Sequence, residues 1–407
     1  MTSTTTTAAP REQTSRETRT LVVVSTVHLI SHYYWLVFAP MLPALREMLQ
    51  VSYTDVGLAI TVMNAVSAIT QAPTGFIVDR YGARLLLFIG VLVGASGFIL
   101  IGLVPVYPML IVGAVLIGLG NAVYHPADYS ILSAEMNPAR MGRAYSIHSF
   151  TGYLGFAIAP PVVLGLMWLG GPRLALVASG VIGIILALPL LPDIAPERRN
   201  VASRRGVPKA KASAWALITP AVVALTLMFT MLNMSTNMMQ TYMVVSLDQL
   251  FGLSHAVGNT GLTVFLSTLV VGIIIGGFIA DRVRSQSMVA AAGFGLAALL
   301  IVLVGTLDVG AVATVSLIGL AGLLAGIIMP SRDLLVRKAS PPDAVGRVFG
   351  IVTTGFNFGG MVAPIIGGML VDHHWPAWIF YGSAIFMLAT VVIAVAVEKN
   401  ARFGVRV

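Results

Sequence analysis

Residues 75–80 read GFIVDR and residues 277–282 read GFIADR, so one six-residue pattern returns after 202 positions. A longer segment repeats as well: HPADYSILSAEMNPARMGRAYSI begins at residue 125, and MPSRDLLVRKASPPDAVGRVFGI begins at residue 329. The two align without a gap at an offset of 204, which superimposes two prolines and a Gly-Arg pair. Similarity at a constant offset indicates an internal repeat. The sequence therefore predicts two halves of the same architecture.

The composition is that of a membrane protein. Hydrophobic residues make up 57% of the chain and charged residues 10%, whereas a soluble domain carries about 25% charged residues. Such a chain cannot cover its surface with polar groups, so we expect most of that surface to face a lipid bilayer. The chain has no cysteine, which excludes disulfide bonds and thiolate metal sites.

Twelve apolar segments are long enough to cross the hydrocarbon core as helices, which takes about 20 residues. The predicted spans are 21–45, 54–78, 85–104, 108–136, 142–168, 173–192, 215–246, 256–280, 287–306, 310–338, 344–371 and 375–397. We therefore predict an all-α membrane protein with twelve transmembrane helices in two pseudo-symmetric six-helix bundles. The predicted parts are a disordered tail at 1–20, a bundle at 21–192, a linker at 193–214, a bundle at 215–397 and a tail at 398–407.

The positive charges predict the orientation. All but three of the 24 lysine and arginine residues lie in the two tails or in the connections on one side; the exceptions are Arg46, Arg173 and Arg332. Connections rich in lysine and arginine stay in the cytoplasm. We expect a multi-pass protein of the inner (plasma) membrane with both termini cytoplasmic. The net charge of +8 then reflects topology, and no nucleic-acid partner is predicted.

The segment GFIVDRYGAR, residues 75–84, resembles the cytoplasmic signature Gly-x-x-x-Asp-Arg-x-Gly-x-Arg of the major facilitator superfamily. The resemblance extends from about residue 20 to 397. GLGNAVYHPADYS and GRAYSIHSFTGYLGFAIAP look like the fosmidomycin-resistance-type branch of drug exporters. The family implies two bundles around a central cavity lined by the first, fourth, seventh and tenth spans. One departure is Ala114, which stands where the fourth span often has an arginine.

Candidate gate residues follow from the signature. Asp79, Arg80 and Arg84 lie at a helix end, where a carboxylate can accept from the free N–H groups of a neighbouring helix. The resemblance implies that Asp79 holds the halves together on the cytoplasmic side, and we expect Glu135 to pair with Arg84. Alternatively, the basic residues only fix the topology. The mirror-image gate residues are Asp281 and Arg282.

Asp128 and Arg332 align across the repeat, which places them at equivalent points on opposite bundles. Ionisable residues within spans usually face a cavity and find partners. We expect a charge pair or network between them that closes when the cavity opens outward. Asp333 is expected to point about 100° away, into its own bundle. The alternative is a salt bridge within one bundle, without a role in transport.

Histidines lie near this aspartate. His28 and His32 are four residues apart on one face of the first span, and His125 lies one turn before Asp128. Since histidine titrates near physiological pH, either His32 or His125 beside an aspartate is a candidate proton carrier; the alternative is a neutral, hydrogen-bonded side chain. No third metal ligand is evident in the sequence, so no metal site and no cofactor are predicted.

The seventh span carries a polar stripe in LMFTMLNMSTNMMQTYMVV, where Asn233, Asn237 and Gln240 recur at helical spacing. Methionines surround them, and thioether side chains adapt to varied shapes. We predict that Asn237 and Gln240 line the cavity. Hydrogen bonds between packed helices are the alternative.

These features together predict a secondary active transporter that works by alternating access. We expect proton-coupled export of a small organic molecule, with uptake of an organic acid by proton symport as the alternative. Arg332 favours an anionic or phosphonate-like cargo. No phosphate-binding loop, zinc motif or nucleophile elbow occurs in a suitable context, so no enzyme is predicted. The expected partners are the substrate, protons and lipid, and the expected state is a monomer.

Overall fold

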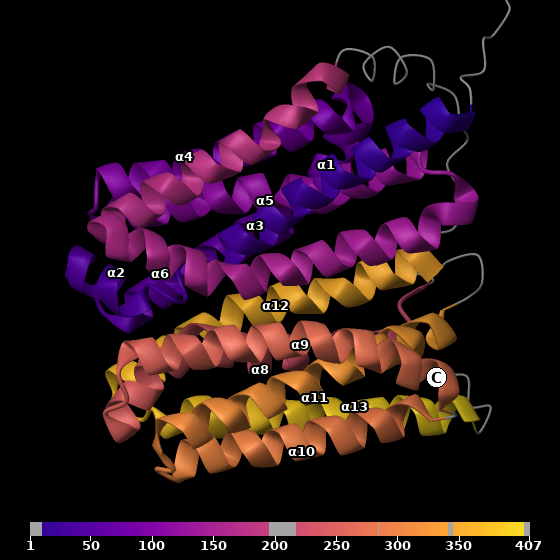
Figure 1. Ribbon diagram of the computed structural model, residues 1–407. Coiled ribbons are helices and arrows are strands. Elements are labelled where there is room, and N and C mark those ends of the chain that lie inside the picture. Colours follow the sequence, from indigo (N-terminus) through magenta and orange to yellow (C-terminus); the bar gives the residue numbers. More distant parts are fainter. Residues whose placement is uncertain (1–9, 195–216, 284, 341–344, 403–407) are drawn as a thin grey trace, which may run out of the picture.

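The computed structural model describes residues 10–194, 217–283, 285–340 and 345–402, and every regular element in these residues is a helix (Figure 1). The first half comprises α1 (Pro10–Leu36), α2 (Leu42–Leu49), α3 (Tyr53–Tyr81), α4 (Ala83–Leu103), α5 (Tyr107–Glu135), η1 (Pro138–Arg140), α6 (Met141–Ala187) and η2 (Leu188–Asp193). The second half comprises α8 (Pro220–Phe251), α9 (His255–Arg282), α10 (Gln286–Thr306), α11 (Gly310–Ala339), α12 (Val345–Asp372) and α13 (Ala377–Arg402).

The helices match the predicted spans, with two of those spans joined in α6. Nine helices of the described chain are long and apolar enough to cross a membrane, or ten with α3, which is bent by 56°. The long α6 breaks at Gly170 and Gly171, where the backbone leaves the helical region. Gly171 has φ of 74°, a value that favours glycine. Ten helices including α3, a second crossing within α6, and α1 together account for the twelve predicted crossings.

The prediction of a disordered tail is wrong for residues 10–20, which form the beginning of α1. Polar contacts explain the helix. Glu17 is buried and pairs with Arg140 at 3.2 Å. Thr20 donates to a Glu135 carboxylate oxygen at 2.8 Å, and Arg19 pairs with an oxygen of Asp193 at 3.2 Å. Residues 1–9 and most of the predicted linker, 195–214, lie outside the described residues.

The first predicted span, 21–45, is not one helix. The chain leaves α1 after Leu36 and begins α2 at Leu42. Ala39 and Leu42 each precede a proline, and the ring of a following proline disfavours the helical conformation. The turn is nevertheless well packed, because Val37, Phe38 and Met41 are fully buried.

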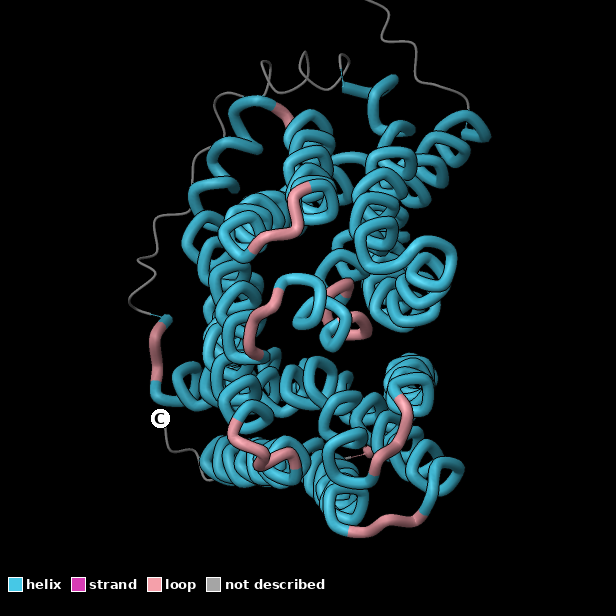
Figure 2. The backbone as a smooth tube through the Cα atoms, turned by 90° about the vertical axis from the view of Figure 1, so that its left-hand side faces the viewer, coloured by secondary structure: helices cyan, strands magenta, loops and turns pink. Residues whose placement is uncertain are grey.

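The two halves form two bundles with equivalent packing. In the first bundle α5 packs on α3 and α4; in the second, α11 packs on α9 and α10. The bundles meet along two helix pairs, α3 with α12 and α6 with α9. Figure 1 shows the first bundle above the second, and Figure 2 shows the same arrangement along the helix axes. The predicted internal repeat is therefore visible in three dimensions.

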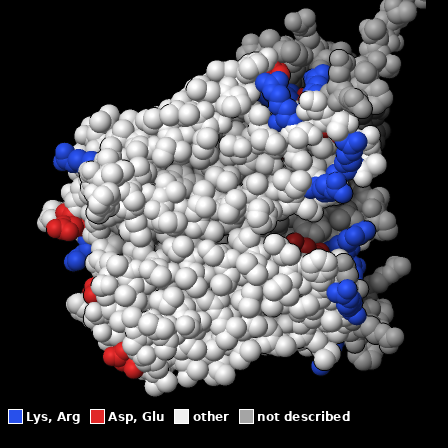
Figure 3. All heavy atoms as spheres, in the orientation of Figure 1, with Lys and Arg blue, Asp and Glu red and all other residues white. Residues whose placement is uncertain are grey.

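The two ends of the molecule differ in charge. Lysine and arginine gather at the end where α13 finishes, which we call the basic end (Figure 3). Arg84, Arg140 and the last-turn residues Arg337 and Lys338 of α11 belong to this end. The opposite end, which carries α2, is called the far end. A chain whose basic residues gather at one end matches a topology with cytoplasmic loops on that side.

Candidate functional site

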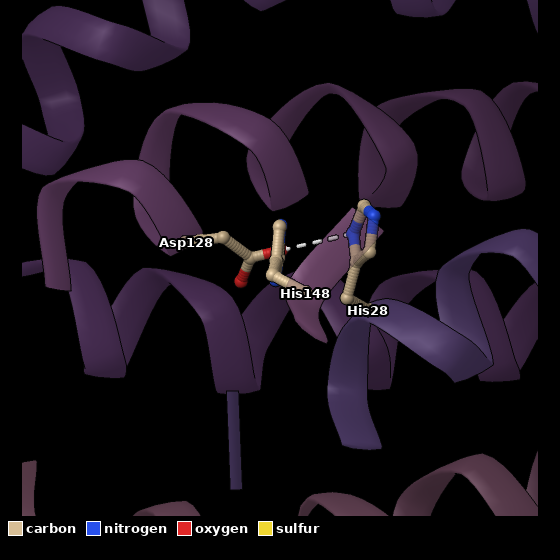
Figure 4. Close-up of side chains that lie close together, drawn as sticks. All are labelled: His28, Asp128 and His148. Atoms are coloured by element: carbon tan, nitrogen blue, oxygen red, sulfur yellow. Dashed lines mark ion pairs between the residues drawn. The ribbon is translucent and has the colours of Figure 1, made fainter. Parts of the chain in front are cut away.

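Asp128 lies inside the first bundle and is enclosed by helices α1, α5 and α6 (Figure 4). An oxygen of its carboxylate lies 3.2 Å from Nδ1 of His28, on α1, and 3.7 Å from Nε2 of His148, on α6. Asp128 and His148 are 0% exposed and His28 is 3% exposed. Pro126 stands inside α5 two residues before Asp128. An ionisable group at this depth needs a partner or a proton.

Two further histidines extend this group. The His28 ring centroid lies 4.6 Å from that of His32 and 5.4 Å from that of His125. We refer to His28, His32, His125, His148 and Asp128 as the histidine cluster. Gly152 makes room for it, because a Cβ atom there would lie 2.7 Å from Nε2 of His28 and 2.9 Å from Nε2 of His32. His148 is the member that the sequence analysis missed.

The cluster is poor in hydrogen bonds. Both carboxylate oxygens of Asp128, Nδ1 of His28 and both ring nitrogens of His148 are buried without a well-aligned hydrogen bond in the described structure. An isolated carboxylate in such a place is very costly. It is stabilised when a proton lies on the carboxyl group or on an adjacent imidazole. Binding of one proton by the cluster would therefore offset the cost of burying this carboxylate.

Three of these side chains correct the expectation that a third metal ligand is lacking. Ligand atoms of His28, Asp128 and His148 all lie within 4.8 Å of one another. However, the rings of His28 and His148 are stacked, with centroids 3.7 Å apart and an interplanar angle of 23°. Imidazoles that share one tetrahedral metal ion direct their nitrogens at a common point and spread apart. The stacked arrangement favours a proton-binding cluster over a metal site.

Arg332 of α11 occupies the equivalent place in the second bundle. Its guanidinium lies over the rings of Phe229 and Phe356, at 4.6 and 5.4 Å from their centroids. Its Nε donates to Asp333 at 2.9 Å, and a second nitrogen lies 2.8 Å from the same carboxylate. The expectation that Asp333 points away is wrong, because the long arginine side chain folds back onto its neighbour. Tyr153 of α6 also interacts with this guanidinium across the bundle interface.

Asp128 and Arg332 do not pair with each other in this structure. Asp128 pairs with His28 of its own bundle, and Arg332 pairs with Asp333 of its own bundle while also interacting with Tyr153 of the first bundle. This is the intra-bundle alternative that the sequence left open. The expected pair was assigned to a state with the cavity open outward, and that expectation stays a prediction.

The polar stripe of α8 lies partly in the core. Asn237 donates to the Asn233 side chain at 3.3 Å, one helical turn away. Gln240 is buried, between the fully buried Met239 and Thr241. The amide pair within the helix and the buried glutamine match helix packing as well as cavity lining. The role of Asn237 and Gln240 in binding stays a prediction.

The candidate gate residues at the basic end show one predicted pair. Arg84 forms a bidentate ion pair with Glu135 at 2.6 and 2.7 Å, as expected. Asp79 and Arg80 are exposed, and Asp79 has no partner among the described residues. Arg282 is exposed and donates to the carbonyl oxygen of Phe278 at 3.3 Å. The side chain of Asp281 lies outside the described part of the structure.

The bundles are joined at the far end. Thr61 of α3 donates to the carbonyl oxygen of Met361 at 2.7 Å, and Asn259 of α9 donates to that of Pro40 at 3.3 Å. Toward the basic end, by contrast, the side chains of Tyr129 and Asp333 are 44% and 48% exposed, although each lies six residues before the end of its helix. Figure 3 shows the surface hollowed between the bundles on that side. The structure is thus closed at the far end and open toward the basic end.

Two charged centres at equivalent positions in paired helical bundles, beside a hollow open at one end, define a membrane transporter. The family model "Major Facilitator Superfamily" matches residues 24–331 and 251–403. The chain belongs to the major facilitator superfamily, and it is a multi-pass membrane protein that transports small molecules and is not an enzyme.

Several curated proteins are similar over most of the chain. The fosmidomycin resistance protein of Escherichia coli (strain K12) is 26% identical over 370 residues, which cover 87% of this chain and 86% of that protein. The probable sulfoacetate transporter SauU of Cupriavidus necator is 26% identical over 81% of each chain. The probable nitrate/nitrite transporter NarK2 of Mycobacterium tuberculosis is 22% identical over 86% of this chain and 89% of its own.

Solved transporter structures share the fold. A bacterial homolog of the human lysosomal transporter Spinster, in an inward-facing and occupied conformation, superimposes with a TM-score of 0.75 at 16% identity and covers 94% of this chain and 95% of its own. The nucleoside transporter NupG superimposes with a TM-score of 0.73 at 17% identity, over 93% and 99%. At these identities the likeness establishes the fold alone.

Proposed function

We propose that the protein exports a small organic anion in exchange for protons. The observation that carries the proposal is the pair of charged centres at equivalent positions: Asp128 among buried imidazoles, and Arg332 beside the hollow. The first centre changes its charge by binding a proton, and the second keeps its positive charge. Two such centres suffice for an exchanger, because each ligand can then bias the equilibrium between the same two states.

The basic end is proposed to face the cytoplasm. The positive-inside rule supports this orientation, with both termini cytoplasmic in the plasma membrane. The structure then represents an inward-open state, because its far end is closed and its hollow faces the basic end. An anion from the cytoplasm reaches Arg332 through this hollow. Binding sites near the interface of two repeats are typical of such transporters.

The cycle uses the two centres in turn. In the inward-open state an anion exchanges with Asp333 on the Arg332 guanidinium, while the histidine cluster releases its proton to the cytoplasm. The bundles then rock, Asp79 and Arg80 close the basic end against the second bundle, and the anion leaves at the far end. A proton from outside returns the cluster to its charge-balanced form. Because each ligand changes the equilibrium between the states, proton and anion binding are coupled.

The names of the relatives support an anionic cargo and export. Sulfoacetate, nitrate and nitrite are anions, and these words appear in the names of two relatives. Resistance to a compound, as in the name of the relative of Escherichia coli, fits efflux. Arg332 offers a planar, permanently charged fork suited to carboxylates, sulfonates and phosphonates.

Transport by the purified protein in liposomes tests the proposal. Vesicles are loaded with a panel of labelled carboxylates, sulfonates and phosphonates plus a neutral sugar, and efflux is measured with the outside acidic, with the outside alkaline, and without a gradient. We expect an acidic exterior to accelerate efflux of one or more anions but not of the sugar, and efflux to alkalinise the outside medium. Efflux that ignores the polarity of the gradient would exclude proton coupling.

Proton-coupled uptake of an organic acid is the second candidate. The names of relatives that are probable transporters of sulfoacetate or nitrate do not specify export. The same vesicles distinguish the two directions of coupling. In a symporter the anion and the proton move together, so efflux of the anion acidifies the outside medium, whereas in the proposed exchanger it alkalinises that medium.

A further inference from the structure

A carboxylate of the second bundle caps a helix of the first bundle at the far end. Asp372 is the last residue of α12, and one of its oxygens accepts from the backbone N–H of Tyr53 at 3.0 Å. The other oxygen accepts from the backbone N–H of Thr54 at 2.8 Å and from the Thr54 hydroxyl at 2.6 Å. Tyr53 and Thr54 are the first two residues of α3. All three hydrogen bonds therefore cross from one bundle to the other.

Helix electrostatics strengthen this contact. The first N–H groups of a helix have no partner within the helix, and the N-terminus carries a partial positive charge. Ser52 and Asp55 cap α3 from within its own bundle, with Asp55 accepting from the Ser52 N–H at 2.9 Å. Those two residues leave the N–H groups of Tyr53 and Thr54 to Asp372. The negative charge of Asp372 is unfavourable at the C-terminus of its own helix α12 and favourable at the N-terminus of α3. The stabilising contacts of this carboxylate therefore come from the other bundle.

Glycines allow the two helices to come this close. A Cβ atom at Gly368 of α12 would lie 2.6 Å from Cα of Thr54, and one at Gly57 of α3 would collide with the carbonyl oxygen of Pro364. Backbone therefore rests directly on backbone next to the Asp372 contact. The Thr61 hydrogen bond to Met361 continues this contact toward the middle of the helices.

Among the residues that the structure describes, the second seam between the bundles, α6 with α9, shows no carboxylate contact of this kind. At the offset of 204, Trp168 of α6 stands in the place of Asp372, and it is 86% exposed. At the offset of 202, His255, which begins α9, stands in the place of Tyr53. Its ring interacts with Asp248 of its own bundle at 3.2 Å. The carboxylate contact is thus specific to the α3–α12 seam.

We infer that Asp372 holds the far end of the two bundles closed, and that its release from the N-terminus of α3 is a required step in opening that end. We call this contact the far-end clasp. It acts between bundles, whereas Asp55 caps the same helix within one bundle. The clasp needs neither a bound anion nor a transported proton. It therefore contributes to the equilibrium between far-end-closed and far-end-open molecules even without substrate.

Distance measurements between paired labels test the clasp. The chain contains no cysteine, so introduced pairs carry the only labels. The exposed residues Val104 and Val309 report on the far end when each is replaced by cysteine and spin-labelled in nanodiscs. Asp372→Asn keeps one acceptor but places an NH₂ group against a backbone donor. We expect it to raise the ratio of far-end-open to far-end-closed molecules by about tenfold, the effect of about 1.4 kcal/mol at a helix terminus.

Matched variants make the test decisive. Asp55→Asn removes a carboxylate from the same helix end but no bond between bundles, so its distance distribution should match that of the parent. Thr54→Val removes only the hydroxyl bond and should give a smaller shift in the same direction as Asp372→Asn, while Thr54→Ser should behave as the parent. An unchanged distribution in both Asp372→Asn and Thr54→Val, or an equal shift in Asp55→Asn, overturns the inference. Since no substrate or pH gradient is used, failure of the proposed exchange mechanism leaves this result intact.

Discussion

The two bundles place opposite kinds of charge at one structural position. In the first, Asp128 of α5 lies against His28 of α1 and His148 of α6. In the second, Arg332 of α11 lies against Phe229 of α8 and Phe356 of α12. The three helices that contribute are the same in each repeat. One ancestral frame thus holds an acid among imidazoles on one side and a guanidinium among phenyl rings on the other.

The surroundings determine what each charge can do. Phenyl rings stabilise a cation by about 0.5–2 kcal/mol without accepting its proton, so Arg332 stays charged throughout a cycle. Imidazoles titrate near neutral pH, so the proposed mechanism assigns the change of charge to the cluster around Asp128. The repeat thus determines the position of each charge, whereas the neighbouring side chains determine which ligand that charge suits. Replacing one side chain at a time tests this difference between the two bundles.

Replacing Asp128 by asparagine should have the largest effect. The variant keeps the size of the side chain but removes the negative charge that makes proton binding to the cluster favourable. Coupling between two ligands is typically worth about 5–150-fold in affinity. We expect acceleration of anion efflux by an acidic exterior to disappear, while exchange of labelled for unlabelled anion persists.

The control for that experiment is Asp308→Asn. Asp308 lies in the α10–α11 turn, where it accepts from the Gly310 N–H at 3.2 Å. This variant should keep the full response to the pH gradient. If Asp128→Asn also responds fully at every pH, the proton site lies elsewhere.

Replacing Arg332 should weaken substrate binding and leave proton binding intact. Hydrogen bonds to charged groups are worth about 1.5–3 kcal/mol, so Arg332→Ala should raise the apparent KM for the anion by about tenfold or more. Arg332→Lys should fall between the parent and the alanine variant, because an ammonium group cannot form the bidentate fork or stack between two rings. Initial rates over a range of anion concentrations measure both effects.

An unchanged KM in Arg332→Ala would mean that Arg332 does not bind the anion. A matched control is Arg173→Ala, which removes an arginine from the turn between the two crossings of α6. It should leave the KM for the anion as in the parent.

How much of the site could be predicted from the sequence depends on how its residues are related along the chain. The repeat and the two aligned charges follow from a constant offset along one chain, and Arg84 with Glu135 follows from helix ends on one side of the membrane. The spacing of residues along the chain does not predict which side chains of other helices become neighbours. His148 lies in the fifth predicted span, where no acidic residue marks it as a neighbour of Asp128.

The same limit explains the missed partners of Arg332 and the missed far-end clasp. Phe229 and Phe356 look like ordinary membrane-helix residues, and Asp372 looks like a helix-end aspartate beside two exposed histidines. Each gains its role only from the packing of α12 on α8 and on α3. The bend of Arg332 onto Asp333 was missed for another reason, because helical angle alone ignores the reach of a long side chain.

Two histidine replacements rank the members of the histidine cluster. His148 is fully buried and lies 3.7 Å from Asp128. His32 is half-buried, and its ring lies 4.6 Å from that of His28. We expect His148→Gln to shift the pH dependence of efflux. His32→Gln should change the rate by less than about threefold, or about 0.7 kcal/mol, without moving the pH profile. A larger shift in His32→Gln would reverse the assigned order.

The smallest effect on transport is expected at a third difference between the bundles, the ion pair of Arg84 and Glu135. At the offsets of the repeat the second bundle has Gln286 and Ala339 instead, and Gln286 donates to the backbone carbonyl oxygen of Ala280 at 3.1 Å. Glu135→Gln should lower the free energy of unfolding by about 1–3 kcal/mol, because it leaves the buried Arg84 guanidinium with one acceptor fewer. Transport should change by less than about twofold, or about 0.4 kcal/mol.

Thermal unfolding of the detergent-solubilised protein measures this stability, and the efflux assay measures the transport. Gln286→Ala serves as the counterpart in the second bundle, and it should cost less stability because it removes no charged group. Efflux lost in Glu135→Gln at unchanged stability would mean that the pair acts as a gate. The first bundle would then differ from the second in motion as well as in charge, because only one half would carry an ion pair that must break during the cycle.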